Sequence, residues 1–108
     1  MSAEAEILRR YRTIAVVGLS SDETRDSYSV SKYMQDAGYR IIPVHPTASE
    51  VLGEKAHPTV AAAGASVIWM QEGIVHEEAA ARAREAGLEV VMDRCIRSAH
   101  RRLRAEPE

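Results

Sequence analysis

The run Gly18-Leu19-Ser20 brings together residue types that bind phosphate. It follows the apolar residues 14–17, and Arg25 comes soon after it. A glycine at the end of a buried strand lets the backbone turn sharply and approach a ligand closely, although glycine also ends many strands that bind nothing. The N–H groups of Leu19 and Ser20 and the Ser20 hydroxyl can donate to a phosphate, and Arg25 can add a charge-assisted contact. These residues therefore indicate the binding of a phosphate-bearing ligand.

The same turn lacks the pattern of a nicotinamide site. Such a site usually shows G-x-G-x-x-G in the first turn and an acidic residue at the end of the second strand. Gly18 is the only glycine of this turn, and the second apolar run ends in Pro43-Val44-His45-Pro46 without an acid. Both differences count against NAD. His45 is a candidate donor to an adenosine phosphate, although a loop histidine is commonly only solvated.

An Ala-Gly dipeptide recurs before each later β-rich run. The three dipeptides end at Gly38, Gly64 and Gly87, and the runs after them are residues 39–44, 65–70 and 88–92. A helix that ends on a left-handed glycine and leads into a strand gives this pattern. Together with an opening strand at 13–19, it predicts an α/β, Rossmann-like three-layer fold with a mostly parallel sheet of four to five strands. The whole chain, residues 1–108, is predicted to form one domain.

Four helices are predicted around this sheet. They are an N-terminal helix within residues 1–11, a helix at 27–37 with Ser27 as its N-cap, and helices at 75–86 and 96–103, with residues 104–108 as a frayed tail. The middle of the chain departs from this alternation, because residues 59–62 leave room for roughly one helical turn whereas a crossover needs about a dozen residues. The stretch 51–60 is therefore expected to run nearly extended, and the fold is expected to be shortened here.

Composition excludes several classes of protein. The net charge of −2 argues against nucleic acid or an anionic membrane as the main partner. Cys95 is the single cysteine, so no internal disulfide forms, and we expect a cytoplasmic protein. No apolar run is long enough to span a bilayer. The four histidines lack the spacing of a metal site, and none is predicted.

Several blocks resemble one known family. The runs TIAVVGLS, AGYRIIPVHP, LGEK, VIWMQEGIV and AGLEVVMDRC resemble the small bacterial and archaeal CoA-binding proteins, which are related to the CoA-binding domain of the succinyl-CoA synthetase α subunit. The resemblance implies a Rossmann-like sheet and coenzyme A, or an acyl-CoA, at the Gly18 turn and at the end of the second strand. The ligand-contacting residues expected from the turn chemistry and the resemblance together are Gly18, Leu19, Ser20, Arg25, Ser27, Tyr28, Pro43, Val44, His45, Pro46, Gln71 and Gly73.

This chain departs from the family pattern at two places. The family usually has Asn where this chain has His45. Family members also carry about thirty more residues after the LGEK block, which supply a strand next to the first strand and a full helix. The strand at 66–70 is then expected either to take the place beside the first strand or to pair with another copy of the chain, which leaves a homodimer open.

The most favoured function is a binding module for CoA without catalysis. An alternative is an enzyme in which Cys95 or Asp93, at the end of the last strand, acts on the acyl or thiol end of the ligand. Another is a regulatory or assembly protein that has lost the ligand. Trp69 is interpreted as a core residue rather than a stacking platform.

Overall fold

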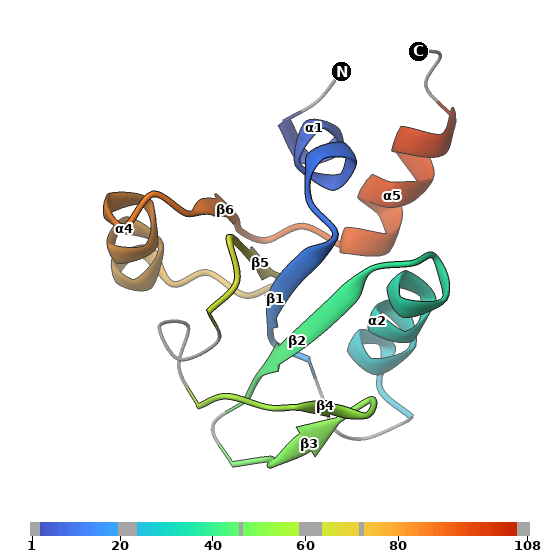
Figure 1. Cartoon of the computed structure of the whole chain (residues 1–108), viewed down its shortest axis with the longest axis horizontal. Coiled ribbons are helices and arrows are strands. Elements are labelled where there is room, and N and C mark those ends of the chain that lie inside the picture. The colour runs from blue at the N-terminus through green and yellow to red at the C-terminus, as the bar shows by residue number, and fades with distance from the viewer. Residues whose placement is uncertain (1–2, 20–23, 46, 59–63, 72, 106–108) are drawn as a thin grey trace.

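Four parallel strands form the central sheet of the computed structural model, which describes residues 3–19, 24–45, 47–58, 64–71 and 73–105. The order is β2-β1-β5-β6, which confirms the predicted parallel α/β sheet (Figure 1). The strands are β1 (Thr13–Val17), β2 (Arg40–Val44), β5 (Val67–Met70) and β6 (Glu89–Val91). The predicted strands are too long at their ends. The first strand, for example, ends at Val17 because Gly18 takes a φ of +92°, which extended backbone does not allow.

Helices cover both faces of the sheet and complete the three predicted layers. Those described are α1 (Ala3–Arg10), α2 (Asp26–Asp36), α4 (Glu77–Glu85) and α5 (Ile96–Ala105). Helices α1, α2 and α5 pack on one face, where Leu8, Met34 and Ile96 share a core with Trp69. On the other face, α4 packs Ala80 against residues such as Ile68. Figure 1 shows this separation, with α4 lying apart from the other helices.

The predicted helix ends need three corrections. Arg25, not Ser27, occupies the N-cap of α2, with extended backbone angles and no side-chain capping bond, so the N-cap lies two residues earlier than predicted. His76 caps α4, because its Nδ1 accepts from the Ala79 N–H at 3.2 Å, and this helix is shorter than predicted. The last helix continues through Ala105, so Arg104 is helical rather than frayed, whereas residues 106–108 lie outside the described residues.

The prediction of a nearly extended stretch at 51–60 is wrong for its first part. Strands β3 (Glu50–Val51) and β4 (Glu54–Lys55) form an antiparallel hairpin. Leu52 and Gly53 both have positive φ, +55° and +76°, which is the turn conformation that matches the twist of a two-residue hairpin. The Leu52 carbonyl oxygen also accepts a 3.0 Å bond from the Gln35 side chain of α2, which ties the hairpin to that helix.

The shortened middle places β5 directly beside β1. Ala15 pairs with Ile68, Val16 with Trp69 and Val17 with Met70, in parallel register. Of the two expectations for this strand, the first is therefore confirmed, and β5 needs no second copy to complete its pairing. The predicted single helical turn at 59–62 lies outside the described residues.

A buried histidine joins α5 to the rest of the fold. The Nδ1 atom of His100 lies 2.9 Å from the Tyr33 hydroxyl of α2, and the rings of Tyr33 and Tyr39 both meet the imidazole edge-on at 5.5 Å. The Tyr39 hydroxyl donates a 2.6 Å bond to the Leu8 carbonyl oxygen of α1. Burial lowers the pKa of His100 below its ordinary value of 6.5, and the nearby charges of Arg104 and Arg12 lower it further.

We therefore expect acid to destabilise the fold through His100. The unfolded chain binds a proton at this site more readily than the folded chain, so stability is full above a pH of about 6.5 and falls as the pH drops below it toward the folded pKa. Urea unfolding midpoints measured across this range are expected to decline more steeply for the natural chain than for His100→Gln. Equal declines in the two proteins would assign the acid sensitivity to other groups.

Candidate functional site

The Gly18 turn ends β1 at the carboxyl edge of the sheet. Gly18 is exposed, whereas the Leu19 side chain is 1% exposed and anchors the turn in the core. A Cβ at Gly18 would lie 2.8 Å from Cγ1 of Ile74 and 3.7 Å from Cβ of Gln71. The turn thus demands glycine both for its φ of +92° and for its contact with the chain after β5. Ser20 lies outside the described residues.

The start of α2 follows this turn. The carbonyl oxygen of Arg25 accepts from the N–H groups of Tyr28 and Ser29, at 3.1 and 3.3 Å, and so begins the helix. Arg25 is exposed, and Ser27 is half-buried. The half-buried Tyr28 packs against the core. The first turn of α2 and the Gly18 turn thus lie close together in the chain, on the strand-to-helix connection where phosphate sites of α/β proteins occur.

The end of β2 is closed by backbone bonds and by His45. Pro43 and Val44 are buried, so their side chains belong to the core. The His45 N–H donates to the His57 carbonyl oxygen at 2.9 Å. Its Nδ1 accepts from the N–H groups of Thr47 and Ala48, at 3.1 and 2.9 Å. A neutral His45 therefore carries its ring proton on Nε2, where it remains a donor. Pro46 lies outside the described residues.

His45 closes its loop in the way that asparagine commonly does. The side-chain oxygen of Asn accepts from backbone N–H groups two or three residues ahead, which is an Asx turn. The contacts from Nδ1 of His45 to residues 47 and 48 have the same spacing. Histidine at this position therefore closes the loop with the contacts that an asparagine side chain could make.

Polar groups after β5 bind within the protein. The Gln71 side-chain oxygen accepts from the Ile96 N–H at 3.2 Å, at the start of α5. The Gly73 N–H donates to a carboxylate oxygen of Asp93 at 2.7 Å. The oxygen of Gln71 and the N–H of Gly73 are therefore already paired, so any ligand contact there must use other atoms of these residues. Sequence reasoning gave Asp93 no positioning role, and nothing in the sequence marked Ile74 as the neighbour of Gly18.

Trp69, Cys95 and Asp93 all make contacts within the protein. Trp69 is fully buried and its Nε1 donates to the Arg94 carbonyl oxygen at 2.9 Å, which confirms its interpretation as a core residue. Cys95 is half-buried, and its carbonyl oxygen accepts from Ala99 as α5 begins. Asp93 holds the Gly73 turn. Within the described residues, no group of three or more metal-ligating side chains comes together, and no helix is both long and apolar enough to cross a membrane.

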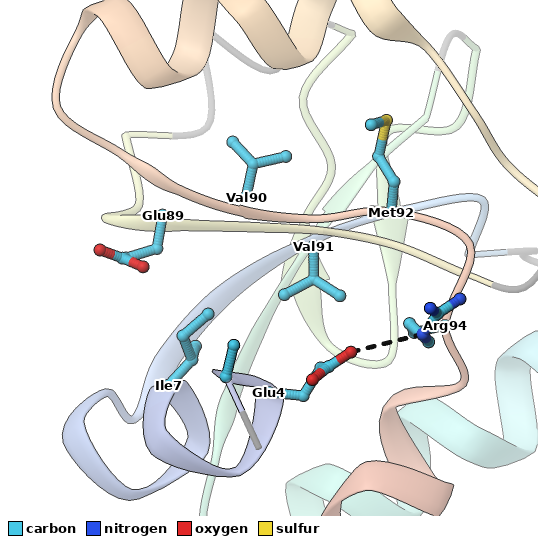
Figure 2. Close-up of a pocket in the computed structure, with 8 residues that line it drawn as sticks. Glu4, Ile7, Glu89, Val90, Val91, Met92 and Arg94 are labelled. Atoms are coloured by element: carbon cyan, nitrogen blue, oxygen red, sulfur yellow. Dashed lines mark ion pairs between the residues drawn. The ribbon is translucent and has the colours of Figure 1, made fainter.

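A pocket of about 230 Å³ lies elsewhere, between α1 and the edge strand β6. Figure 2 shows Ile7 and Val91 facing each other across it, with Glu89 at one end. Glu4 and Arg94 form an ion pair of 3.3 Å at the other end. The two carboxylates in its lining disfavour a phosphate-rich ligand, so this pocket does not compete with the Gly18 turn for one.

Comparisons with known proteins identify the family of the chain. Residues 12–64 and 58–101 match the CoA binding domain family in two overlapping segments. The chain is 45% identical to the uncharacterised protein YneT of Bacillus subtilis, over 121 residues that cover 88% of this chain and 90% of YneT. These 121 aligned positions exceed the 108 residues of the chain, so the relative has residues that this chain lacks.

Two solved structures share the fold. The crystal structure of Prb, described as a protein redesigned for binding, is 35% identical with a TM-score of 0.75, covering 96% of this chain and 92% of Prb. A hypothetical protein from Pyrococcus horikoshii is 36% identical with a TM-score of 0.72, covering 93% of this chain and 89% of that protein. Sequence and fold together show that the chain belongs to the CoA binding domain family, which supports a CoA-binding role.

Proposed function

We propose that the chain binds coenzyme A or an acyl-CoA without catalysis, with the phosphates at the turn formed by Gly18, Leu19 and Ser20. The observation that carries this proposal is the Gly18 turn itself. It leaves a buried central strand at the carboxyl edge of a parallel sheet and leads to the N-terminus of α2. Ligands of open α/β sheets bind at this edge, and anions bind at helix N-termini.

The charges around the turn suit phosphate. Arg25 at the N-cap of α2 is exposed and positively charged, and the helix dipole adds to its field. His45, which ends β2 next to β1 in the sheet, offers its Nε2 proton from the neighbouring strand end. In this proposal Arg25 and the turn hold the pyrophosphate, and the end of β2 lies along the adenosine side.

The contacts of Asp93 support a binding module over an enzyme. The Asp93 carboxylate holds the Gly73 N–H at 2.7 Å, and it therefore serves the turn rather than acting as a free base. The carbonyl of Cys95 lies in the first turn of α5. Cys95 is the residue on which a thiol reaction would depend, and it is half-buried and packed against the core.

Calorimetric titration with CoA, dephospho-CoA and NAD tests the proposal. We expect CoA to bind and NAD not to bind. Arg25→Gln is expected to weaken CoA binding by about tenfold, the effect of losing one exposed charge-assisted hydrogen bond. Arg84→Gln on α4 removes the same charge on the far face of the sheet and is the matched control. Absence of CoA binding, or equal weakening by both substitutions, would contradict the proposed site.

A further inference from the structure

Four arginines lie together at a surface that the proposed CoA site does not use. We call them the arginine face: Arg12, just before β1, and Arg97, Arg101 and Arg104 of α5. The three helical residues are spaced i, i+4 and i+7, so they form one stripe along α5. Arg12, Arg101 and Arg104 are exposed and Arg97 is half-buried. Figure 1 shows α5 beside α1, with β1 starting between them and running away toward its carboxyl end.

Aromatic rings hold two of these arginines, Arg12 and Arg101, near one another. The guanidinium carbon of Arg12 lies 4.8 Å from the centre of the Tyr39 ring, and that of Arg101 lies 5.5 Å from the centre of the Tyr33 ring. Both rings contact His100. Residues that are far apart in the sequence thus place their charges around a single cluster.

The charges of the arginine face are not neutralised by acidic residues of the described part of the chain. Four other cations are neutralised, in the pairs Lys32–Asp36, Arg40–Glu54, Arg82–Glu78 and Arg94–Glu4. None of the four arginines of the face forms an ion pair with any residue that the structure describes. Like charges gathered without partners repel one another, and an incoming anion relieves that repulsion.

We propose that the arginine face docks an acidic segment of a partner protein. The face contains arginine and no lysine, and the half-buried Tyr33 and Leu103 lie beside it. Arginine and tyrosine are enriched at protein interfaces, where lysine is depleted. The apolar side chain of Leu103 beside the arginines suits a protein segment, which carries apolar side chains of its own, better than a polyphosphate.

The arginine face and the proposed CoA site lie at opposite ends of β1. Arg12 precedes β1 and Gly18 follows it, so the five residues of β1 separate them. At about 3.3 Å per strand residue, the six steps from Arg12 to Gly18 span roughly 20 Å. The partner segment and the proposed ligand therefore bind at opposite ends of the same strand without excluding one another.

Nuclear magnetic resonance titration with a polyglutamate peptide tests the docking. We expect the largest amide shifts in α5 and around Arg12. Affinity is expected to fall at least about tenfold in the triple variant R12Q/R101Q/R104Q, and binding is expected to weaken as ionic strength rises from about 0.01 M to about 1 M. The triple variant K55Q/R82Q/R84Q removes the same number of positive charges elsewhere and is expected to bind like the natural chain.

His100 supplies a second readout that needs no variant. Arg104, Arg12 and Arg101 carry the positive charges around it, and Tyr33 and Tyr39 are its other titratable neighbours. An acidic peptide that neutralises Arg104 and Arg12 is expected to raise the pKa of His100, measured from the imidazole resonances.

Four results would overturn the proposal. One is that the peptide leaves α5 and the titration of His100 unchanged, and another is that the two triple variants weaken binding equally. The third is that an oligouridylate of matched length binds the same arginines more tightly than the peptide, which would assign the face to a polyphosphate. Self-association of the natural chain that disappears in R12Q/R101Q/R104Q would assign it to a second copy instead.

Discussion

Gly18→Ala is expected to destabilise the chain by about 2 to 5 kcal/mol. Two costs combine, namely a φ of +92° that suits only glycine and a Cβ that would lie 2.8 Å from Cγ1 of Ile74. A strained backbone residue costs of order 1 to 3 kcal/mol, and overpacking costs a similar amount. The free energy of unfolding in urea measures the loss, which is a large share of the roughly 5 to 15 kcal/mol that stabilises a typical domain.

The double variant Gly18→Ala/Ile74→Ala separates the two costs. Removing Cγ1 and Cδ1 of Ile74 abolishes the close contact but leaves the φ unchanged, so alanine at Gly18 is expected to cost less in the Ile74→Ala background than in the natural chain. An equal cost in both backgrounds would assign the whole effect to the backbone. Loss of CoA binding in a Gly18 variant therefore reports on the fold as well as on the ligand, and Arg25→Gln is the cleaner test of the site.

Trp69→Ala is expected to be at least as damaging, at about 3 to 5 kcal/mol. The side chain is fully buried in β5 between β1 and β6, and alanine would leave a large cavity. It would also remove the 2.9 Å bond from Nε1 to the Arg94 carbonyl oxygen, which joins the core to the loop before α5. Thermal unfolding followed by circular dichroism measures the effect.

Trp69→Phe distinguishes the hydrogen bond from the packing. Phenylalanine fills much of the volume but has no donor, so its cost is expected to be closer to the roughly 0.5 to 1.5 kcal/mol that one hydrogen bond contributes. If Trp69→Phe were as unstable as Trp69→Ala, the bond to Arg94 would matter more than the core volume.

The sheet could be predicted because its signals are local. Buried parallel strands have continuous apolar runs, and left-handed glycines such as Gly38 and Gly87 mark the helix ends that precede them. The hairpin at residues 50–55 could not be predicted in this way. Its turn places Leu52 at a positive φ, a conformation that leucine rarely adopts, and contacts with α2 hold it there.

The candidate site could be located but not completed from the sequence. The Gly18 turn stands out because it follows a buried strand and precedes a helix. The atoms of Gln71 and Gly73 that are paired within the protein were unpredictable, because their partners Ile96 and Asp93 lie 25 and 20 positions away. The end of a strand tells which residues reach the edge of a sheet, but only the packed fold tells which polar groups are still unpaired there.

The pairing of β5 with β1 shows how a parallel domain can become shorter. All strands of a parallel sheet have the same direction and the same spacing. The backbone of one strand can therefore pair with that of any other strand of the same direction. A deletion that removes one strand together with its helix therefore keeps the direction of every remaining strand. Parallel domains can therefore differ in length by one strand and its helix at a time. The loss of such a unit changes which strand ends are neighbours at the carboxyl edge of the sheet, where ligands of these folds bind.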